Sequence, residues 1–484
     1  MNRGIITAIF VFLLCVTNVY AANYYVREGG KSSTCTSWFD ACDQLSTAVN
    51  LAPRGSTIYV AEGTYNGVSF NTAVSGTTVI TVKKATASDH GTEAGWSSSY
   101  GDGVAEFTDK FTFNTGYWTI DGVTGGGPSA WATGHGFRLN KPSALVKHTF
   151  VVFSTADPSH ITLRHINIGP DTMGWPGWDT AIYAPGGGGA DAPYLTMEYC
   201  YVHHMSNIGG FFGGGHQMIQ YNLFYMCANQ TVAGDVICLG AGNPYELCTG
   251  YNTPTAPENH GSTIALRNPS DYTTIRYNVF GNSEGSGQIG FYTRGTYNHI
   301  KIYGNIFYNN YPGRGPATNI YHTNGTPQYL KIYNNTFFGP NNVRVLNLYD
   351  GTANNEFKNN LIYEVTYDVY ITGTTMTYNK NASDRSDRPG LDRSLQYLRS
   401  DPFLNKNITY AQFPMLPDFS LRYATQDGEH LKNETVEGVL HTYNTDMLGN
   451  TRGADGTWDR GAYEFGGKLS YTAPKQPSGL RTIP

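Results

Sequence analysis

Two arginines, Arg267 and Arg294, occupy matching places in a repeated sequence pattern. Each lies eight residues before an Ile that opens a recurring phrase, Ile275-Arg-Tyr-Asn-Val-Phe280 for the first and Ile302-Tyr-Gly-Asn-Ile-Phe307 for the second. If both project from adjacent turns on one side, they repel each other by about 1 kcal/mol near a surface. Arg holds a carboxylate with two hydrogen bonds, so the pair predicts a site for an anion. The alternative is that each Arg lies across a Tyr ring such as Tyr292, or pairs with an acidic residue of a loop.

Other polar and aromatic residues belong to the same candidate site. Asn324 lies eight residues before Ile332, in step with the two arginines, and Tyr292 lies between them in sequence. His260 or Tyr292 is our hypothesis for a general base, because Arg stays protonated up to a pKa of about 12.5 or higher. A single His also commonly has a packing or loop role.

Aromatic residues of a long insertion are candidate sugar contacts. Trp175 and Trp178 stand in the sequence Gly-Trp-Pro-Gly-Trp. Such rings could stack on sugar faces, or they could pack down on the body of the protein, because Trp is rarely left wholly exposed.

Two carboxylates provide a different chemistry. Asp235 and Glu258 could form the acid and base of a glycoside hydrolase, which needs two carboxyl groups about 5–9.5 Å apart. A glycoside hydrolase is therefore an alternative hypothesis to an anion site built on the two arginines.

The element that must position these residues is a repeat. Seven short segments share an apolar residue, usually an Asn three positions on, and another apolar residue two further: 163–168, 197–202, 219–224, 275–280, 302–307, 332–337 and 357–362. A recurrence every two to three dozen residues predicts a solenoid in which equal positions of successive turns form columns. The gaps also require a second strand per turn, expected at Val236–Leu239, Thr263–Leu266, Gln288–Tyr292, Asn319–His322 and Val345–Leu348.

The columns of this repeat are expected to be scaffold. Asn222, Asn278, Asn305, Asn335 and Asn360 should occupy the left-handed bend between strands, with each amide bonded to the Asn of the next turn. The Ile and Phe columns should form the core. Insertions such as 122–136, 169–190 and 240–262 would project as loops, which often build the binding face of a repeat protein.

The composition agrees with short strands and tight turns. Charged residues make up 14% of the 484 residues, whereas Gly (57) and Tyr (36) are abundant. The formal net charge of −5, without clustered Lys and Arg, argues against nucleic-acid binding. Beyond the first residues we expect no membrane-spanning segment.

The first 21 residues predict export. Arg3, an apolar run from Ile5 to Val16 and the small residues of Val19-Tyr-Ala21 are typical of a signal peptide. Six cysteines would remain in the mature chain, which allows fifteen disulfide pairings, and Cys35–Cys42 is the local pair we expect. The protein is therefore expected to be extracellular or periplasmic.

The ends of the solenoid need covers. Residues 36–52 have apolar residues at helical spacing, and Ser37 with Asp40 could cap this helix, which would close the first turn. From these features we expect a signal peptide at 1–21, the solenoid with its helical cap at 22–400, a closing segment at 401–466 and a flexible tail at 467–484.

Several phrases resemble a known superfamily. The closing phrases Asp401-Pro-Phe-Leu, Asp418-Phe-Ser-Leu421 and Asp459-Arg-Gly-Ala-Tyr-Glu464, with the Asn-bearing repeats, resemble secreted bacterial proteins of the pectate-lyase-like superfamily. This resemblance implies an all-β fold, a right-handed parallel β-helix with an N-terminal helical cap. It says little about activity, because this fold carries lyases, hydrolases, epimerases and adhesins.

A narrower resemblance concerns the arginines. Ile264-Ala-Leu-Arg-Asn268 and Phe291-Tyr-Thr-Arg-Gly295 are similar to phrases of the chondroitinase-B and alginate-lyase family, where a Lys acts as base and an Arg as acid. Arg294 matches the family Arg, whereas Arg267 stands where the Lys is expected. The acidic calcium ligands of that family correspond here to His260 and Ser262, so calcium is not assured and the metal stays open.

The sequence therefore leads to three hypotheses. The first is cleavage of an acidic, uronate-containing extracellular polysaccharide by β-elimination, with Arg267 neutralising the carboxylate and Arg294 as proton donor or charge clamp. The second is a non-catalytic glycan-binding or surface-structural solenoid such as an adhesin. The third is the hydrolase that uses Asp235 and Glu258. The oligomeric state and the particular sugar stay open.

Overall fold

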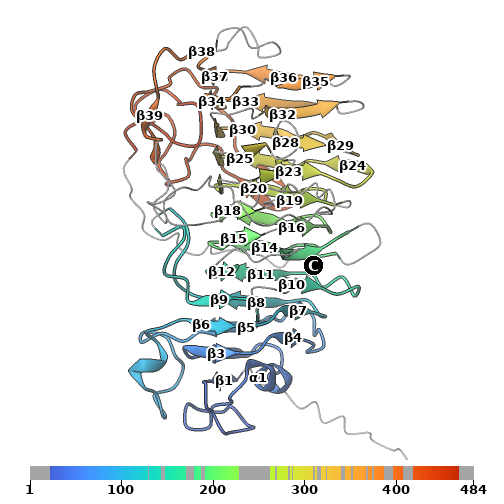
Figure 1. Cartoon of the computed structure of the whole chain (residues 1–484), viewed down its shortest axis with the longest axis vertical. Coiled ribbons are helices and arrows are strands. Elements are labelled where there is room, and N and C mark those ends of the chain that lie inside the picture. The colour runs from blue at the N-terminus through green and yellow to red at the C-terminus, as the bar shows by residue number, and fades with distance from the viewer. Residues whose placement is uncertain are drawn as a thin grey trace, which may run out of the picture.

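Three long parallel sheets wind around one core in the computed structural model of the chain. The structure describes residues 22–128, 130–142, 148–170, 179–186, 191–205, 207–227, 262–267, 270–281, 284–285, 287–308, 311–312, 318–322, 324–339, 344–349, 353–366, 369–372, 375–385, 396–406 and 418–467. Successive coils stack along the long axis of the molecule (Figure 1). The fold is a right-handed parallel β-helix, which confirms the fold expected from the sequence.

The first sheet, sheet A, has 12 strands: β1 (Asn23–Val26), β2 (Thr57–Val60), β5 (Ile80–Lys84), β8 (Trp118–Asp121), β11 (Ile161–Arg164), β14 (Thr196–Glu198), β17 (Met218–Gln220), β20 (Thr274–Arg276), β25 (Lys301–Tyr303), β30 (Lys331–Tyr333), β33 (Asn355–Lys358) and β36 (Met376–Asn379).

Sheet B also has 12: β3 (Gly63–Tyr65), β6 (Ala105–Phe107), β9 (Phe137–Leu139), β12 (Ile166–Ile168), β15 (Tyr201–Met205), β18 (Leu223–Cys227), β21 (Val279–Gly281), β26 (Ile306–Tyr308), β31 (Thr336–Phe338), β34 (Leu361–Tyr363), β37 (Ala382–Ser383) and β38 (Gln396–Tyr397).

Sheet C has 10 strands: β4 (Val68–Phe70), β7 (Phe111–Phe113), β10 (Thr149–Phe153), β13 (Thr180–Ala184), β16 (Ile208–Phe212), β19 (Ser262–Leu266), β23 (Gly287–Phe291), β28 (Thr318–His322), β32 (Arg344–Tyr349) and β35 (Tyr370–Thr372). Four of the expected second strands correspond to β19, β23, β28 and β32, and Val236–Leu239 lies outside the described residues.

Four short pairs flank the three sheets. They are β22 (Glu284–Gly285) with β27 (Tyr311–Pro312), β24 (Gly295–Asn298) with β29 (Gly325–Gln328), β39 (Phe403–Asn405) with β40 (Asp418–Leu421), and β41 (Glu434–Val436) with β42 (Val439–His441). One 3-10 turn, η1 (Ser98–Tyr100), lies in an insertion between β5 and β6.

Each repeated phrase is the corner between a strand of sheet A and one of sheet B. Ile275, Ile302 and Ile332 are register partners in sheet A, and Phe280, Phe307 and Phe337 are partners in sheet B. The Phe rings stack with centroids 4.9 Å apart. All of these side chains are fully buried, which confirms the apolar columns as core.

The Asn column forms a buried hydrogen-bond ladder, as expected. In a middle step, Asn278 donates from its backbone N and from Nδ2 to Oδ1 of Asn305, at 2.9 and 3.0 Å, and Asn305 bonds to Asn335 in the same way. The ladder runs from Asn222 through Asn360 and reaches one step further, to Asn381.

One detail of the expected corner was wrong. The left-handed residue is the one before the ladder Asn, with φ of 55° at Tyr221, 56° at Tyr277 and 52° at Asn334. The ladder Asn itself must point its amide inward along the coil axis, so the preceding residue makes the bend and its side chain faces outward.

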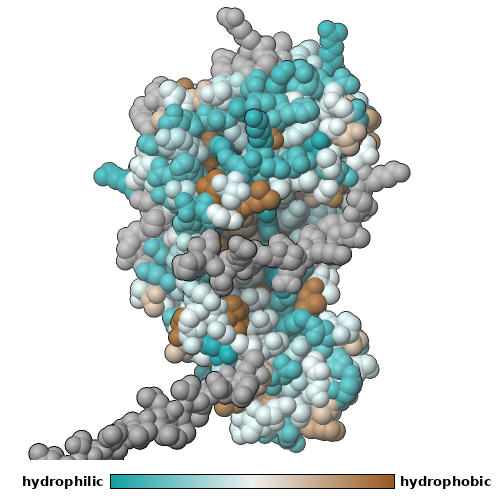
Figure 2. Space-filling model, turned by 180° about the vertical axis from the view of Figure 1, so that it is seen from behind, coloured by the Kyte–Doolittle hydropathy of each residue, from teal (hydrophilic) through white to brown (hydrophobic). Residues whose placement is uncertain are grey.

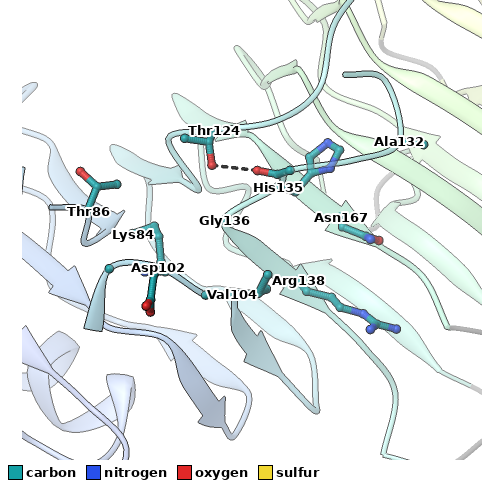
Figure 3. A pocket seen from close by; sticks show the side chains of 13 residues that line it. Lys84, Thr86, Asp102, Val104, Thr124, Ala132, His135, Gly136, Arg138 and Asn167 are labelled. Atoms are coloured by element: carbon teal, nitrogen blue, oxygen red, sulfur yellow. Dashed lines mark hydrogen bonds between the residues drawn. The ribbon is translucent and has the colours of Figure 1, made fainter. Parts of the chain in front are cut away.

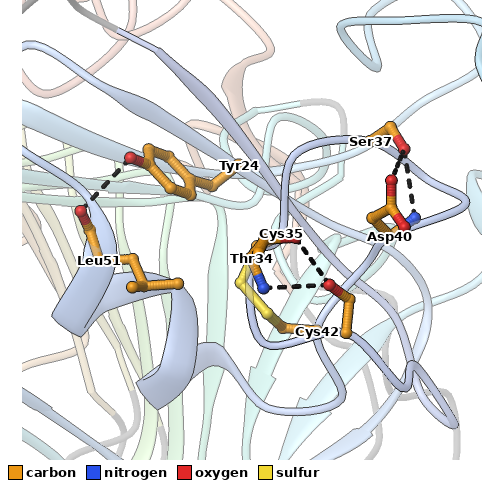
Figure 4. Close-up of a disulfide and its surroundings, with 8 residues drawn as sticks. Tyr24, Thr34, Cys35, Ser37, Asp40, Cys42 and Leu51 are labelled. Atoms are coloured by element: carbon orange, nitrogen blue, oxygen red, sulfur yellow. Dashed lines mark hydrogen bonds between the residues drawn. A yellow bond between two sulfur atoms is a disulfide. The ribbon is translucent and has the colours of Figure 1, made fainter.

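The N-terminal cap contains the only α-helix of the described residues, α1 (Leu45–Leu51), which packs against β1, β2 and β4 and buries Leu45, Ala48 and Val49. The helix is shorter than the expected 36–52, because the Cys35–Cys42 disulfide closes a loop whose ends bond to Tyr25 of β1 (Figure 4). Ser37 and Asp40 hydrogen-bond to each other within that loop, at 3.2 Å, instead of capping the helix.

The disulfide expected from the sequence is therefore present. Cys200 and Cys227 are buried free thiols, and Cys238 and Cys248 lie outside the described residues. None of the helices in the described part of the chain is long and apolar enough to span a membrane.

A C-terminal segment, residues 398–406 and 418–467, runs back along the outside of the upper coils, where Figure 1 shows it at the left. Its apolar residues Phe419, Leu431, Tyr443 and Trp458 form a second core with outward residues of sheets A and B such as Tyr303. Tyr277 donates from its hydroxyl to the carbonyl of Thr442 at 3.1 Å. The segment thus covers the side of the solenoid.

Candidate functional site

The edge where the middle strands of sheet C end carries the predicted site residues. Arg267 follows β19, Tyr292 follows β23, and Asn324 lies two residues beyond β28. Because the strands are parallel, these ends share one side of the solenoid. We call this place the sheet C edge. It comprises Arg267, Tyr292, Arg294 and Asn324, with Tyr321 of β28 and Ser262, the first residue of β19, whose hydroxyl contacts those of Tyr292 and Tyr321.

The structure corrects the alignment of the two arginines. In sheet A the neighbouring coils are offset by 27 residues, from Ile275 to Ile302, whereas in sheet C Leu266 pairs with Phe291, an offset of 25. Arg267 is therefore level with Tyr292, and Arg294 lies two residues further along. Counting from sheet A failed because the turn after β23 is two residues longer than the turn after β19.

Arg267 lies between aromatic rings. Its guanidinium carbon is 4.7 Å from the centroid of the Phe211 ring and 5.7 Å from that of Tyr292, and its Nε is buried without a hydrogen-bond partner. The alternative of an Arg lying across Tyr292 is confirmed for Arg267. Such stacking leaves the in-plane donors of a guanidinium directed past the rings, where a carboxylate can be held.

Three hydroxyls meet beside Arg267. Tyr292 accepts hydrogen bonds from Ser262 at 3.2 Å and from Tyr321 at 2.7 Å, and Ser262 and Tyr321 also contact each other. The Tyr292 oxygen therefore has two hydrogen-bond donors, and a guanidinium lies beside its ring. Tyr292 is partly exposed, so a substrate can reach it.

Two glycines of β23 make room for this cluster. A Cβ at Gly290 would lie 2.8 Å from the Tyr292 ring and 3.0 Å from the Tyr321 ring, and one at Gly287 would lie 2.8 Å from the Tyr321 ring. The Tyr321 ring therefore lies across the backbone of β23 and brings its hydroxyl to Tyr292.

Arg294 and Asn324 are level with each other and exposed. They directly precede β24 and β29, whose first residues Gly295 and Gly325 are register partners. Asn324 donates to the Tyr292 carbonyl at 3.4 Å. The turn that carries Arg294 is fixed by the hydroxyl of Tyr297, which accepts from the backbone N of Thr293 at 3.1 Å.

Five predicted site residues, His260, Trp175, Trp178, Asp235 and Glu258, lie outside the described residues. The calcium positions expected from the family resemblance are His260 and Ser262, and Ser262 is a neutral hydroxyl engaged by Tyr292 and Tyr321. The Ser262 hydroxyl does not replace the carboxylate that a calcium ion requires at this position, and we derive no step through a metal. The described residues contain no cluster of three or more His, Cys, Asp or Glu arranged to hold a metal ion.

Ser262 and Tyr321 were not recognised from the sequence as partners of Tyr292. The signal was the spacing within sheet C itself: with offsets of 25 and 31 residues, Ala265, Gly290 and Tyr321 are register partners. The small residues at the first two places indicate that a large ring from the third lies over them.

The known proteins that are similar to this chain have low sequence identity to it. No protein-family model and no curated protein matches the sequence. Solved structures with some similarity to this chain include the pectate lyase Pel9A. It has 14% identity and a TM-score of 0.47, and the match covers 93% of this chain and 98% of that one. Another is XylC in complex with xylose, with 10% identity, a TM-score of 0.43 and coverage of 91% and 98%.

A rhamnogalacturonan lyase is similar over 80% of this chain and 91% of its own, with 11% identity and a TM-score of 0.38. At such identities the function of this chain has to be judged from its own residues.

Proposed function

We propose that the protein binds an acidic, uronate-containing polysaccharide at the sheet C edge and cleaves it by β-elimination. The observation that supports this most is the Tyr292 hydroxyl, which accepts hydrogen bonds from Ser262 and Tyr321 beside the guanidinium of Arg267. A proton acceptor next to a cation is the combination that proton removal beside a carboxylate requires.

The reaction assigns one role to each group. Arg267 neutralises the uronate carboxylate, which makes the neighbouring C–H more acidic. The Tyr292 phenolate takes that proton, the released electron pair forms a C=C bond, and the glycosidic C–O bond breaks. The leaving oxygen is protonated or its charge is held by Arg294, and Asn324 contributes a donor to the substrate. Of the two candidate bases, His260 and Tyr292, the proposal uses Tyr292, and His260, which lies outside the described residues, stays the alternative.

An extracellular or periplasmic location belongs to the same proposal. It is supported by the Cys35–Cys42 disulfide, since such bonds persist in oxidising compartments. The substrate, a polysaccharide outside the cell, requires the same location.

The test is an ultraviolet assay for the unsaturated product. The protein without residues 1–21 would be incubated with alginate, pectate, chondroitin and neutral glycans, with and without calcium. We expect absorbance to rise with an acidic glycan and to be lost in Tyr292→Phe. New reducing ends without absorbance would instead indicate a hydrolase using Asp235 and Glu258. Binding without cleavage would indicate an adhesin-like protein.

A further inference from the structure

Two insertions at one corner of the lower coils surround a cavity. The corner between sheets A and B is only one or two residues long at the Asn ladder, but residues 85–104 separate β5 from β6, and residues 122–136 separate β8 from β9. Between them lies a cavity of about 350 Å³, lined by Lys84, Asp102, His135, Arg138 and Asn167 among others (Figure 3). It opens at sheet B, whereas the proposed elimination site lies at sheet C.

A buried His lacks the partners that a purely structural His would have. His135 is 5% exposed, and neither of its ring nitrogens has a hydrogen-bond partner of normal geometry, although the ring lies beside the Tyr199 backbone. Burial lowers the pKa of His135 to about 4, so the ring is neutral and has one donor and one acceptor. A hydroxyl group, which both donates and accepts, fits such a ring.

A hydrogen-bond relay fixes the orientation of Asn167 on β12. Its Oδ1 is 2.6 Å from Nε2 of His203, and Nδ1 of His203 is 2.6 Å from Nδ1 of His204. Burial keeps the pKa of His203 well below its usual value, so the ring is neutral. Nε2 must donate to Asn167, and Nδ1 must accept from His204. Asn167 therefore offers its NH₂ group, a pure donor, to the cavity.

The charges around the cavity are balanced. Lys84 donates from Nζ to the carbonyls of Ala85 at 2.7 Å and Tyr100 at 3.0 Å, and Arg138 pairs with Glu106 at 3.4 Å. With Asp102, the immediate surroundings hold two cations and two carboxylates. Glu62, a third carboxyl group beside Asp102, has its pKa raised by burial and by that carboxyl, so Glu62 retains its proton more readily than an isolated Glu and adds less negative charge. A charged ligand gains no net attraction here.

We propose that this cavity is a second carbohydrate site, which binds a neutral sugar unit of one or two rings. Its volume suits that size, and its lining offers both hydrogen-bond donors and acceptors, as the hydroxyls of a sugar require. Charged side chains that are already paired recognise hydroxyls without attracting the carboxylates of an acidic chain. The site does not depend on the elimination chemistry of the sheet C edge.

The experiment is calorimetric titration of the whole protein with xylose, galactose, glucose and their β-1,4 disaccharides, and with galacturonate and glucuronate as charged probes. We expect a neutral sugar to bind with a dissociation constant on the order of millimolar, the usual range for so few atoms. Val104→Trp, at a 45% exposed position of the rim, should block the cavity and weaken binding at least tenfold.

A second variant and a control keep the result specific. Asn167→Leu removes the NH₂ donor and should also weaken neutral-sugar binding at least tenfold, with thermal melting confirming that both variants fold. Arg294→Ala should leave this binding unchanged, while Val104→Trp should leave polysaccharide cleavage unchanged. The proposal is overturned if no neutral sugar binds, if the uronates bind more tightly, or if Val104→Trp binds like the unaltered protein.

Discussion

At the scale of single residues, the position of one phenolic oxygen depends on the hydroxyl that Tyr321 brings across the glycines of β23. Tyr321→Phe removes one of the two donors on the Tyr292 oxygen, so this oxygen should be held less firmly against the substrate. In the ultraviolet assay we expect a rate loss of about tenfold. Tyr292→Phe should cost about a hundredfold or more.

Tyr329→Phe is the matched control for these substitutions, because Tyr329 is 43% exposed and directly follows β29, at the opposite end of that strand from Asn324. Its activity and pH profile should match those of the unaltered protein. If Tyr321→Phe lowered activity only in proportion to a loss of thermal stability, Tyr321 would have only a structural role.

A buried ion pair should make the stability of the fold sensitive to a single substitution. Lys141 and Asp179 are 1% and 0% exposed at their side chains, with Nζ 2.7 Å from Oδ2. Burial raises the pKa of Asp179, and the hydrogen bond from Lys141 opposes that rise. Lys141→Met should therefore destabilise the fold by about 3–5 kcal/mol in urea unfolding at neutral pH. Lys380→Met, which breaks an exposed pair with Asp427, should leave the unfolding curve nearly unchanged.

At the scale of elements, the Asn ladder joins the coils at the corner between sheets A and B. Asn305→Ala leaves the buried backbone N of Asn278 and the carbonyl of Ile275 without these partners, at a cost of about 1–3 kcal/mol each. Asn114→Ala, which removes an exposed Asn–Asn contact, should cost far less. Urea unfolding of both variants measures the difference, and equal losses would refute the structural importance of the ladder.

The elements were more predictable from the sequence than the site, for a physical reason. Each coil repeats the same pattern of buried residues. The spacing of Ile275, Ile302 and the ladder Asn residues is therefore enough to predict the coils. The hydroxyl cluster depends on the register of sheet C, which differs from that of sheet A by two residues because the turn after Tyr292 is longer. A turn length affects no burial pattern, so Arg267 and Arg294 appeared aligned when they are not.

At the scale of the whole molecule, the C-terminal segment divides the outer surface. It covers sheets A and B over the upper coils, while the lower coils leave the outer face of sheet B to the cavity at Asn167. Seen from behind, the surface over the upper coils is mostly hydrophilic, with apolar side chains in small groups (Figure 2). The two proposed sites thus lie on different sheets.

Docking of this segment should weaken in acid, because His441 in β42 faces Lys301, Arg276, Lys331 and Glu434. Burial, followed by the nearby cations, lowers the pKa of His441 to about 3, from 6.5 when free. As the pH falls from 6.5 towards 3, only the detached segment takes up this proton, so docking loses free energy throughout that window. Glu434 acts in the same direction at lower pH: burial raises its pKa, but hydrogen bonds from Lys331 and Tyr443 bring it below 4.5, so its contribution disappears as it protonates.

Amide hydrogen exchange of residues 434–443, expressed as protection factors, tests this pH dependence. We expect protection to fall between pH 6.5 and 4 in the unaltered protein and to stay nearly level in His441→Gln, which has no proton to take up in that range. His160→Gln, a substitution in the turn before β11 and far from the segment, should keep the original slope. If protection in His441→Gln falls with pH as steeply as in the unaltered protein, acid acts on another group. If the protection factors of His441→Gln do not change with pH, the burial of the neutral His441 imidazole is what couples docking of the C-terminal segment to pH.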